Sequence, residues 1–169
     1  METVILDLLR DCRPASELGR IELGDSELRQ IVESARLAPS ANNVQPWRFN
    51  AFRDPLLIAE AARAVGLEGL ADAGALIATQ AREGLIRNRW KQQPFAMIDV
   101  PIACLHILLA ATQRNLGTRL VLDFDKPQVK KLLSLDKQPL LALIFIGRPL
   151  ALLDEAQVDC DRVLHVESF

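Results

Sequence analysis

The chain has 169 residues, half of them apolar, and a formal net charge of −2. This length suits one domain, residues 1–169, which can bury roughly 70% of the surface of its unfolded chain. The composition excludes a disordered protein. Charges of both signs are scattered along the sequence, which argues against binding nucleic acid through a basic stripe.

The cysteines bear on metal binding, and the N-terminus and the apolar runs bear on the compartment. The three cysteines lie far apart and lack the Cys and His spacing of a zinc or iron–sulfur site, so we predict no metal. The first residues are acidic where a secretion signal would be basic, and the apolar runs are shorter than the roughly 20 residues that span a bilayer. We predict a soluble cytoplasmic protein without a membrane partner.

The first half of the chain alternates helical and strand patterns. Leu28, Ile31, Val32 and Ala35 recur at the spacing of one buried helix face, and Pro39 stops that helix. Residues 13–24 read as irregular. The predicted helices are residues 4–10, a helix capped by Asp25 or Ser26 that runs to residue 37, residues 55–66 after an Asp54 cap, and a polar helix over 81–92. The predicted strands are residues 47–52 and 75–79.

The second half contains an unusually apolar helix. We predict it over residues 99–117, with Asp99 as its cap and Pro101 in its first turn. Because it lacks a polar face, it must form either the centre of the monomer or the seam of a dimer. The other predictions are strands at 120–124 and 140–146, a helix at 125–133, and a possible strand at 163–166. This order favours an α+β fold over a doubly wound sheet.

Side chains that could act as catalysts are scarce. The two histidines are His106, which we interpret as a hydrogen-bonded structural residue of the apolar helix, and His165, which has no nucleophile placed beside it. No glycine-rich phosphate loop is present, and Gly117 is explained by the end of a helix. We therefore predict no catalytic side chain.

Residues 38–49, APSANNVQPWRF, hold more hydrogen-bonding side chains than a turn needs. Ser40, Asn42, Asn43 and Gln45 either satisfy one another or bind a ligand, and Trp47 either fills the core or lines a site. Spacing alone gives these two interpretations about equal weight.

The segment Ala38 to Trp47 resembles the A-P-S-x-x-N-x-Q-P-W signature of the FMN-dependent nitroreductase family. The stretch LLAATQRNLGT resembles the end of that family's central helix and its G-L-G-T turn, and ALIFIGRP resembles a later strand. The resemblance implies an α–β sandwich with a central, mainly antiparallel sheet flanked by helices. It also implies an intertwined homodimer that binds FMN at its interface.

The resemblance further implies a set of cofactor-binding residues. Arg10 and Arg13 would hold the FMN phosphate, with Asp11 where relatives have serine. The remaining residues of this set would contact or approach the flavin: Pro39, Ser40, Asn43, Gln45, Gly117, Thr118, Leu122 and Asp123. The implied chemistry is ping-pong hydride transfer from NADH or NADPH through flavin N5 to a nitroaromatic, a quinone or a similar acceptor, so the flavin replaces a catalytic side chain.

Three departures from the family pattern favour an alternative. Asp11 adds repulsion beside a phosphate, residues 159–162 are mostly acidic where relatives carry a basic pair, and Asp123 stands where relatives often have glycine. The alternative is a dimeric binding protein on the same scaffold that is non-catalytic or free of FMN.

Overall fold

The structure is a computed structural model, and it describes residues 2–82 and 95–154. The helix predicted over 81–92 and the possible strand at 163–166 lie outside these residues, except for Ala81 and Arg82. Ala81 is the last residue of a strand.

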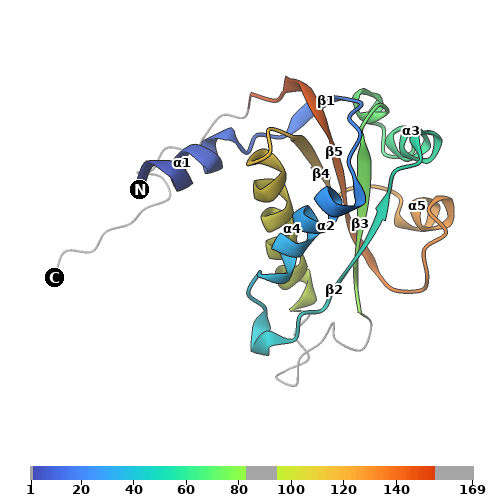
Figure 1. Cartoon of the computed structure of the whole chain (residues 1–169). Coiled ribbons are helices and arrows are strands. Elements are labelled where there is room, and N and C mark those ends of the chain that lie inside the picture. The colour runs from blue at the N-terminus through green and yellow to red at the C-terminus, as the bar shows by residue number, and fades with distance from the viewer. Residues whose placement is uncertain (1, 83–94, 155–169) are drawn as a thin grey trace.

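The described residues form five α-helices, two short 3₁₀ turns and five strands (Figure 1). In chain order they are α1 (Glu2–Asp11), β1 (Ala15–Gly19), α2 (Asp25–Arg36), η1 (Ala41–Asn43), β2 (Trp47–Phe52), α3 (Pro55–Ala64), η2 (Glu68–Leu70), β3 (Ala75–Ala81), α4 (Ala96–Thr112), β4 (Gly117–Val121), α5 (Lys126–Leu132) and β5 (Leu140–Leu152).

All strand pairs in the sheet are antiparallel, and β5 is the central strand. The order is β1-β5-β3-β2, and β4 also pairs with β5. The 13 residues of β5 allow its first half to pair with β3 and β4 and its second half with β1. This explains why its sequence reads as a continuous apolar run rather than as an alternating one.

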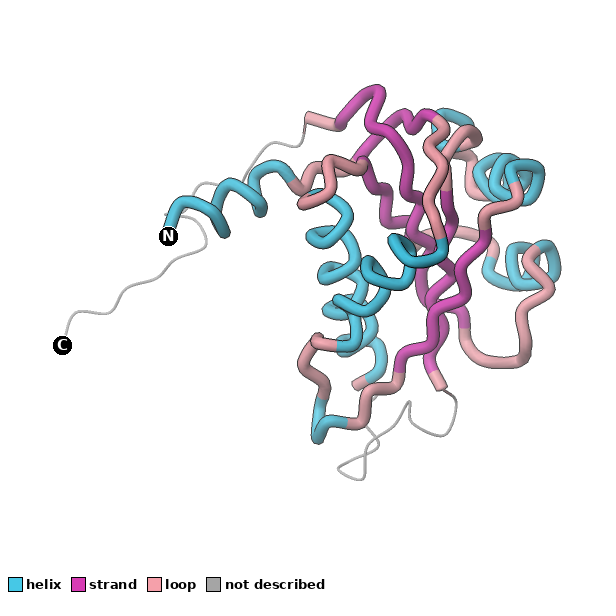
Figure 2. The backbone as a smooth tube through the Cα atoms, in the orientation of Figure 1, coloured by secondary structure: helices cyan, strands magenta, loops and turns pink. Residues whose placement is uncertain are grey.

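Successive side chains of the central strands enter two separate cores. In β5, Ile144 packs in the core beneath α2 and α4, whereas its neighbours Leu143 and Phe145 pack in the core beneath α3 and α5. Ile77 and Leu76 of β3 divide in the same way, as the two-residue period of a strand requires. The result is three layers, with the sheet between two pairs of helices (Figure 2).

Most predicted elements are confirmed, but one segment and the bounds of two elements are wrong. Residues 13–24 are not wholly irregular, because β1 lies within them and pairs with the end of β5. The apolar helix starts at Ala96 and ends at Thr112, so Asp99 lies inside its first turn rather than at its cap. Gly117 begins β4 instead of ending a helix, and β4 therefore starts before the predicted residue 120.

The cap of α2 also differs from the prediction. Neither Asp25 nor Ser26 caps this helix; its N-cap is Gly24, which provides no side-chain hydrogen bond. By contrast, the predicted cap of α3 is confirmed, because Asp54 accepts from the backbone N–H groups of Leu56 and Leu57. Asp125 caps α5 in the same way and accepts from the backbone N–H of Gln128.

Helix α4 is not enclosed by its own chain. One side packs against the sheet and α2, but Met97, Ile98 and Leu105 are exposed, Ile98 by 56%. The monomer-centre interpretation is therefore wrong for this face. Helix α1 projects from the body of the molecule (Figure 1) and exposes Val4 and Ile5 as well. Within the described residues, no helix is long and apolar enough to cross a bilayer.

Candidate functional site

The loop between α2 and β2 has an unusual backbone. Asn42, Asn43 and Gln45 have φ angles of 52°, 55° and 50°, in the left-handed region. A residue other than glycine pays about 1 kcal/mol or more for this conformation, and asparagine tolerates it best. Three such residues within four positions persist only where the surroundings hold them.

Hydrogen bonds within the loop supply part of that support. The Ser40 hydroxyl accepts from the Gln45 backbone N–H at 2.9 Å, and the Gln45 side-chain amide donates to the side-chain oxygen Oδ1 of Asn43 at 2.8 Å. The Ser40 hydroxyl therefore keeps its own hydrogen for another acceptor. Trp47 is buried in the core, as one of the two interpretations of this loop expected.

A second connection ties the loop to the body of the protein. The Ala41 backbone N–H donates to Oδ1 of Asp99, at 3.1 Å, in the first turn of α4. Sequence reasoning missed this contact because Asp99 looked like the cap of its own helix. The two residues are 58 positions apart, and no local pattern could have revealed the bond.

The arginines predicted to hold a phosphate lie at the junction of α1 and β1. Arg10 pairs with Asp7 at 3.3 Å, and Arg13 pairs with the carboxylate of Asp154 and donates to the Leu153 carbonyl at 3.1 Å. Neither arginine pairs with Asp11 in the described part of the chain. These pairs are exposed and contribute little stability, so an anion with better geometry can displace the carboxylates.

Gly117 and Thr118 lie beside this junction, at the start of β4. A β-bridge joins Thr118 to Pro14. A side chain at Gly117 would meet the side chains of Leu18 and Pro149 at 2.8 and 2.9 Å, so packing requires glycine here. Thr118 is only 2% exposed, and among the described residues its hydroxyl has no hydrogen-bond partner. A buried hydroxyl without a partner is energetically unfavourable, and such groups are uncommon in folded proteins.

The predicted residues do not come together within one chain. The loop with Ser40 lies at the first turn of α4, whereas Gly117 follows the last turn, and the 17 residues of this helix span roughly 25 Å. In Figure 1, helix α1 lies toward one end of α4, and the loop that precedes β2 lies toward the other end. Leu122 and Asp123 are exposed just beyond β4, at the edge of the sheet opposite β2.

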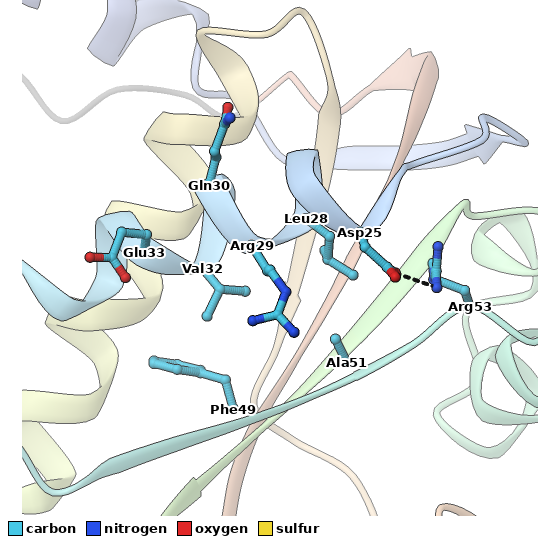
Figure 3. A pocket seen from close by; sticks show the side chains of 9 residues that line it. All are labelled: Asp25, Leu28, Arg29, Gln30, Val32, Glu33, Phe49, Ala51 and Arg53. Carbon is cyan, nitrogen blue, oxygen red and sulfur yellow. Dashed lines mark ion pairs between the residues drawn. The ribbon is translucent and has the colours of Figure 1, made fainter.

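A surface hollow of about 720 Å³ lies elsewhere, between α2 and β2 (Figure 3). Its lining includes Val32, Phe49 and Arg29, together with the ion pair between Arg53 and Asp25. None of the residues predicted to bind a cofactor lines this hollow.

Two buried or hydrogen-bonded groups that could have acted as catalysts are structural. Burial raises the pKa of the Cys104 thiol to about 11, against a weaker opposing effect of the Thr79 hydroxyl 3.7 Å away, so this thiol is no nucleophile near neutral pH. Nδ1 of His106 lies 3.0 Å from the Ser34 carbonyl oxygen, which confirms its interpretation as a hydrogen-bonded residue.

One carboxyl group has a lowered pKa far from the predicted site. The backbone N–H of Gln138 is the main cause of the lowered pKa of Asp136, and the Gln80 amide and Arg48 act in the same direction. These groups fasten the segment before β5 to the adjoining ends of β2 and β3. We assign this cluster to the fold rather than to a ligand.

Comparison with known proteins gives consistent results. A family model described as "Putative TM nitroreductase" matches residues 6–111. A "Putative NAD(P)H nitroreductase" of Streptococcus pyogenes is 24% identical over 143 residues, covering 65% of this chain and 72% of that protein. A "Putative NADH dehydrogenase/NAD(P)H nitroreductase" of Archaeoglobus fulgidus is 32% identical over 101 residues, covering 57% of this chain and 55% of that protein.

Solved structures share the fold. A "putative nitroreductase in complex with fmn" from Desulfovibrio desulfuricans has a TM-score of 0.83 and 24% identity, and the match covers 100% of this chain and 99% of that one. A "putative NAD(P)H:FMN oxidoreductase" from Staphylococcus epidermidis has a TM-score of 0.84 and 15% identity, with coverage of 98% and 96%. The predicted α+β sandwich with a central antiparallel sheet is confirmed.

Proposed function

Because the chain belongs to the nitroreductase family, we propose that it is an FMN-dependent oxidoreductase that takes electrons from NADH or NADPH. We propose a nitroaromatic, a quinone or a similar small molecule as the acceptor. Bound FMN supplies hydride acceptance and release at its N5 atom, in a ping-pong cycle. The names of the curated relatives support the electron donor, and the FMN complexes among the structural neighbours support the cofactor.

The observation that carries this proposal is the placement of the two residue groups at opposite ends of α4. In a homodimer whose α4 helices pack antiparallel, the loop of one protomer approaches the arginine end of its partner. The exposed apolar side chains of α4, Met97, Ile98 and Leu105, suit such a seam, because each gains free energy when it leaves water. We propose that each protomer contributes one domain, residues 1–169, to two shared sites.

The donors available at the two ends fit FMN. Arg10 and Arg13 offer charged donors for the phosphate, and Thr118 and Ser40 each offer a hydroxyl hydrogen that no described residue accepts. We assign the remaining contacts to Pro39, Asn43, Gln45, Gly117, Leu122 and Asp123. These residues bind and orient the cofactor, and the apolar α4 surface excludes water from the space beside it. None of them is required to transfer a proton.

The first experiment is an absorption spectrum of the full-length protein as purified, followed by identification of any released cofactor. We expect flavin bands and FMN. A colourless protein that does not take up added FMN would refute the proposal. Size measurement in solution tests the dimer independently of the cofactor, and a monomer at micromolar concentration would contradict a shared site.

The phosphate contact can be tested with two ligands. We expect Arg13→Ala to weaken FMN binding at least tenfold and to leave riboflavin binding nearly unchanged, because riboflavin lacks the phosphate. Arg63→Ala is the matched control, since this exposed arginine lies in α3 on the other side of the sheet. Equal loss for both ligands would place the phosphate elsewhere.

One observation favours a second candidate. Arg10 is already paired with Asp7 and Arg13 with Asp154. Asp11 adds a third carboxylate, which lies between the two arginines in the sequence. These charges suit a ligand without phosphate, so the alternative is a dimeric binding protein that is non-catalytic or free of FMN. Equal affinity for FMN and riboflavin, together with no oxidation of NADH or NADPH, would establish that alternative.

A further inference from the structure

Asp99 carries a buried carboxyl group that accepts one hydrogen bond from the part of the chain that the structure describes. Its side chain belongs to the first turn of α4 and is 4% exposed, next to the apolar core residues Ala96, Val100 and Ala103. Its Oδ1 accepts the backbone N–H of Ala41 at 3.1 Å, and within the described residues it makes no other hydrogen bond or ion pair. Burying a carboxyl group costs free energy, and the hydrogen bond from Ala41 offsets part of that cost.

The partner of Asp99 stands at the start of the strained loop. Ala41 is the first residue of η1, and Asn42 and Asn43 follow it directly in the left-handed conformation. The bonds of Ser40 and Gln45 hold the loop only to itself. The bond to Asp99 instead fixes the loop to a long helix of the core, and it also satisfies the Ala41 N–H.

We propose that Asp99 is a positioning residue for flavin binding. By holding the Ala41 N–H, its carboxyl oxygen keeps Ser40 and Asn43 in the one backbone conformation that presents them to the cofactor. Without this bond, the left-handed residues relax toward less costly conformations, and the loop must be reordered each time flavin binds. This inference rests on the proposed function and deepens it, and it requires no contact between Asp99 and the flavin.

A purely structural role makes different predictions. A carboxylate in the first turn also interacts favourably with the positive end of the helix dipole, which would stabilise α4 without affecting the loop. Asp99→Asn separates the two roles, because the amide keeps a carbonyl oxygen for the Ala41 N–H but carries no charge. Asp99→Leu removes the acceptor and keeps the same branching and number of heavy atoms.

We would measure FMN affinity and the visible circular dichroism of bound flavin for the full-length variants. We expect Asp99→Leu to weaken FMN binding at least tenfold and to change the dichroism, and Asp99→Asn to stay within threefold of the unmodified protein. Val129→Ala is the control for general destabilisation, since Val129 is fully buried in the opposite core, and it should also stay within threefold. Normal affinity in Asp99→Leu, or equal losses in the Asn and Leu variants, would overturn the inference.

Hydrogen exchange of the Ala41 amide tests the inference without flavin. We expect this amide to exchange at least tenfold more slowly than that of Asn42 in the unmodified protein, and to lose that protection in Asp99→Leu. If the unmodified protein binds no FMN, the proposed function fails, but the exchange measurement still decides whether Asp99 holds the loop. An unprotected Ala41 amide in the unmodified protein would overturn the inference even if Asp99→Leu does not fold.

Discussion

Because its thiol is buried, Cys104 should cause the free energy of unfolding to fall as the pH rises in the alkaline range. The side chain is 0% exposed, and burial raises its pKa from 9.0 to about 11. Between these values the unfolded chain loses the thiol proton while the folded chain keeps it. Because the folded state then binds more protons, the free energy of unfolding falls as the pH rises through this window.

The size of the effect follows from the shift. One pKa unit corresponds to about 1.4 kcal/mol. At pH 10 the unfolded thiol is mostly ionised and the folded thiol is mostly protonated, so this group alone lowers the free energy of unfolding by about 1 kcal/mol relative to pH 7. Cys104→Ala removes the titrating group at a packing cost that does not depend on pH.

The assay is urea unfolding at pH 7, 8.5 and 10 under reducing conditions, for the unmodified protein and for Cys104→Ala. We expect the stability difference between them to shrink by about 1 kcal/mol from pH 7 to pH 10. Ile107→Val, a buried change on the same helix without a titrating group, should keep a constant difference. A constant difference for Cys104→Ala as well would refute the argument that burial shields this thiol.

Three further substitutions test single features of the fold by urea unfolding at pH 7. Gly66 has a φ of 70° and open space around it, so Gly66→Ala should cost about 1 kcal/mol through the backbone alone, and an unchanged midpoint would contradict this. Asp54→Ala removes the cap of α3 and should cost about 1 kcal/mol, whereas Asp54→Ser should recover most of it. Ser40→Ala leaves the Gln45 N–H without its acceptor and should cost about 1 kcal/mol, and a stability equal to that of the unmodified protein would mean that water replaces the hydroxyl.

Elements with a local signal were predictable from the sequence. Helices α3 and α5 each follow an aspartate cap and carry proline in their first turn, and both signals act within a few residues. Strand β3 and the first half of β5 are apolar enough to be recognised without knowledge of their partners. Strand β1 lacks such a pattern, and its register with β5 contains irregularities, so only the partner strand defines it.

In the candidate site, too, local features could be predicted from the sequence and long-range contacts could not. The segment around Ser40 was recognisable because its polar residues lie within six consecutive positions. Its left-handed backbone and its bond to Asp99 were not, since both depend on a helix far along the chain. The bounds of α4 were misjudged for a related reason: its N-cap is Phe95, which provides no side-chain hydrogen bond, whereas Asp99 looks like a cap and bonds to another segment.

The exposed apolar surface of α4 and the separation of the site residues have a common explanation. A monomer that exposes Ile98 and Leu105 on one helix, and Val4 and Ile5 on a projecting one, presents more large apolar side chains than a solitary protein needs. The same monomer holds its strained loop and its arginines at opposite ends of α4, so the residues proposed to bind the cofactor do not meet within one chain. The dimer that we propose, in which two copies associate along α4, would account for both features. Substituting Leu105 by lysine should therefore reduce dimer formation and FMN binding together, and loss of one without the other would separate the two explanations.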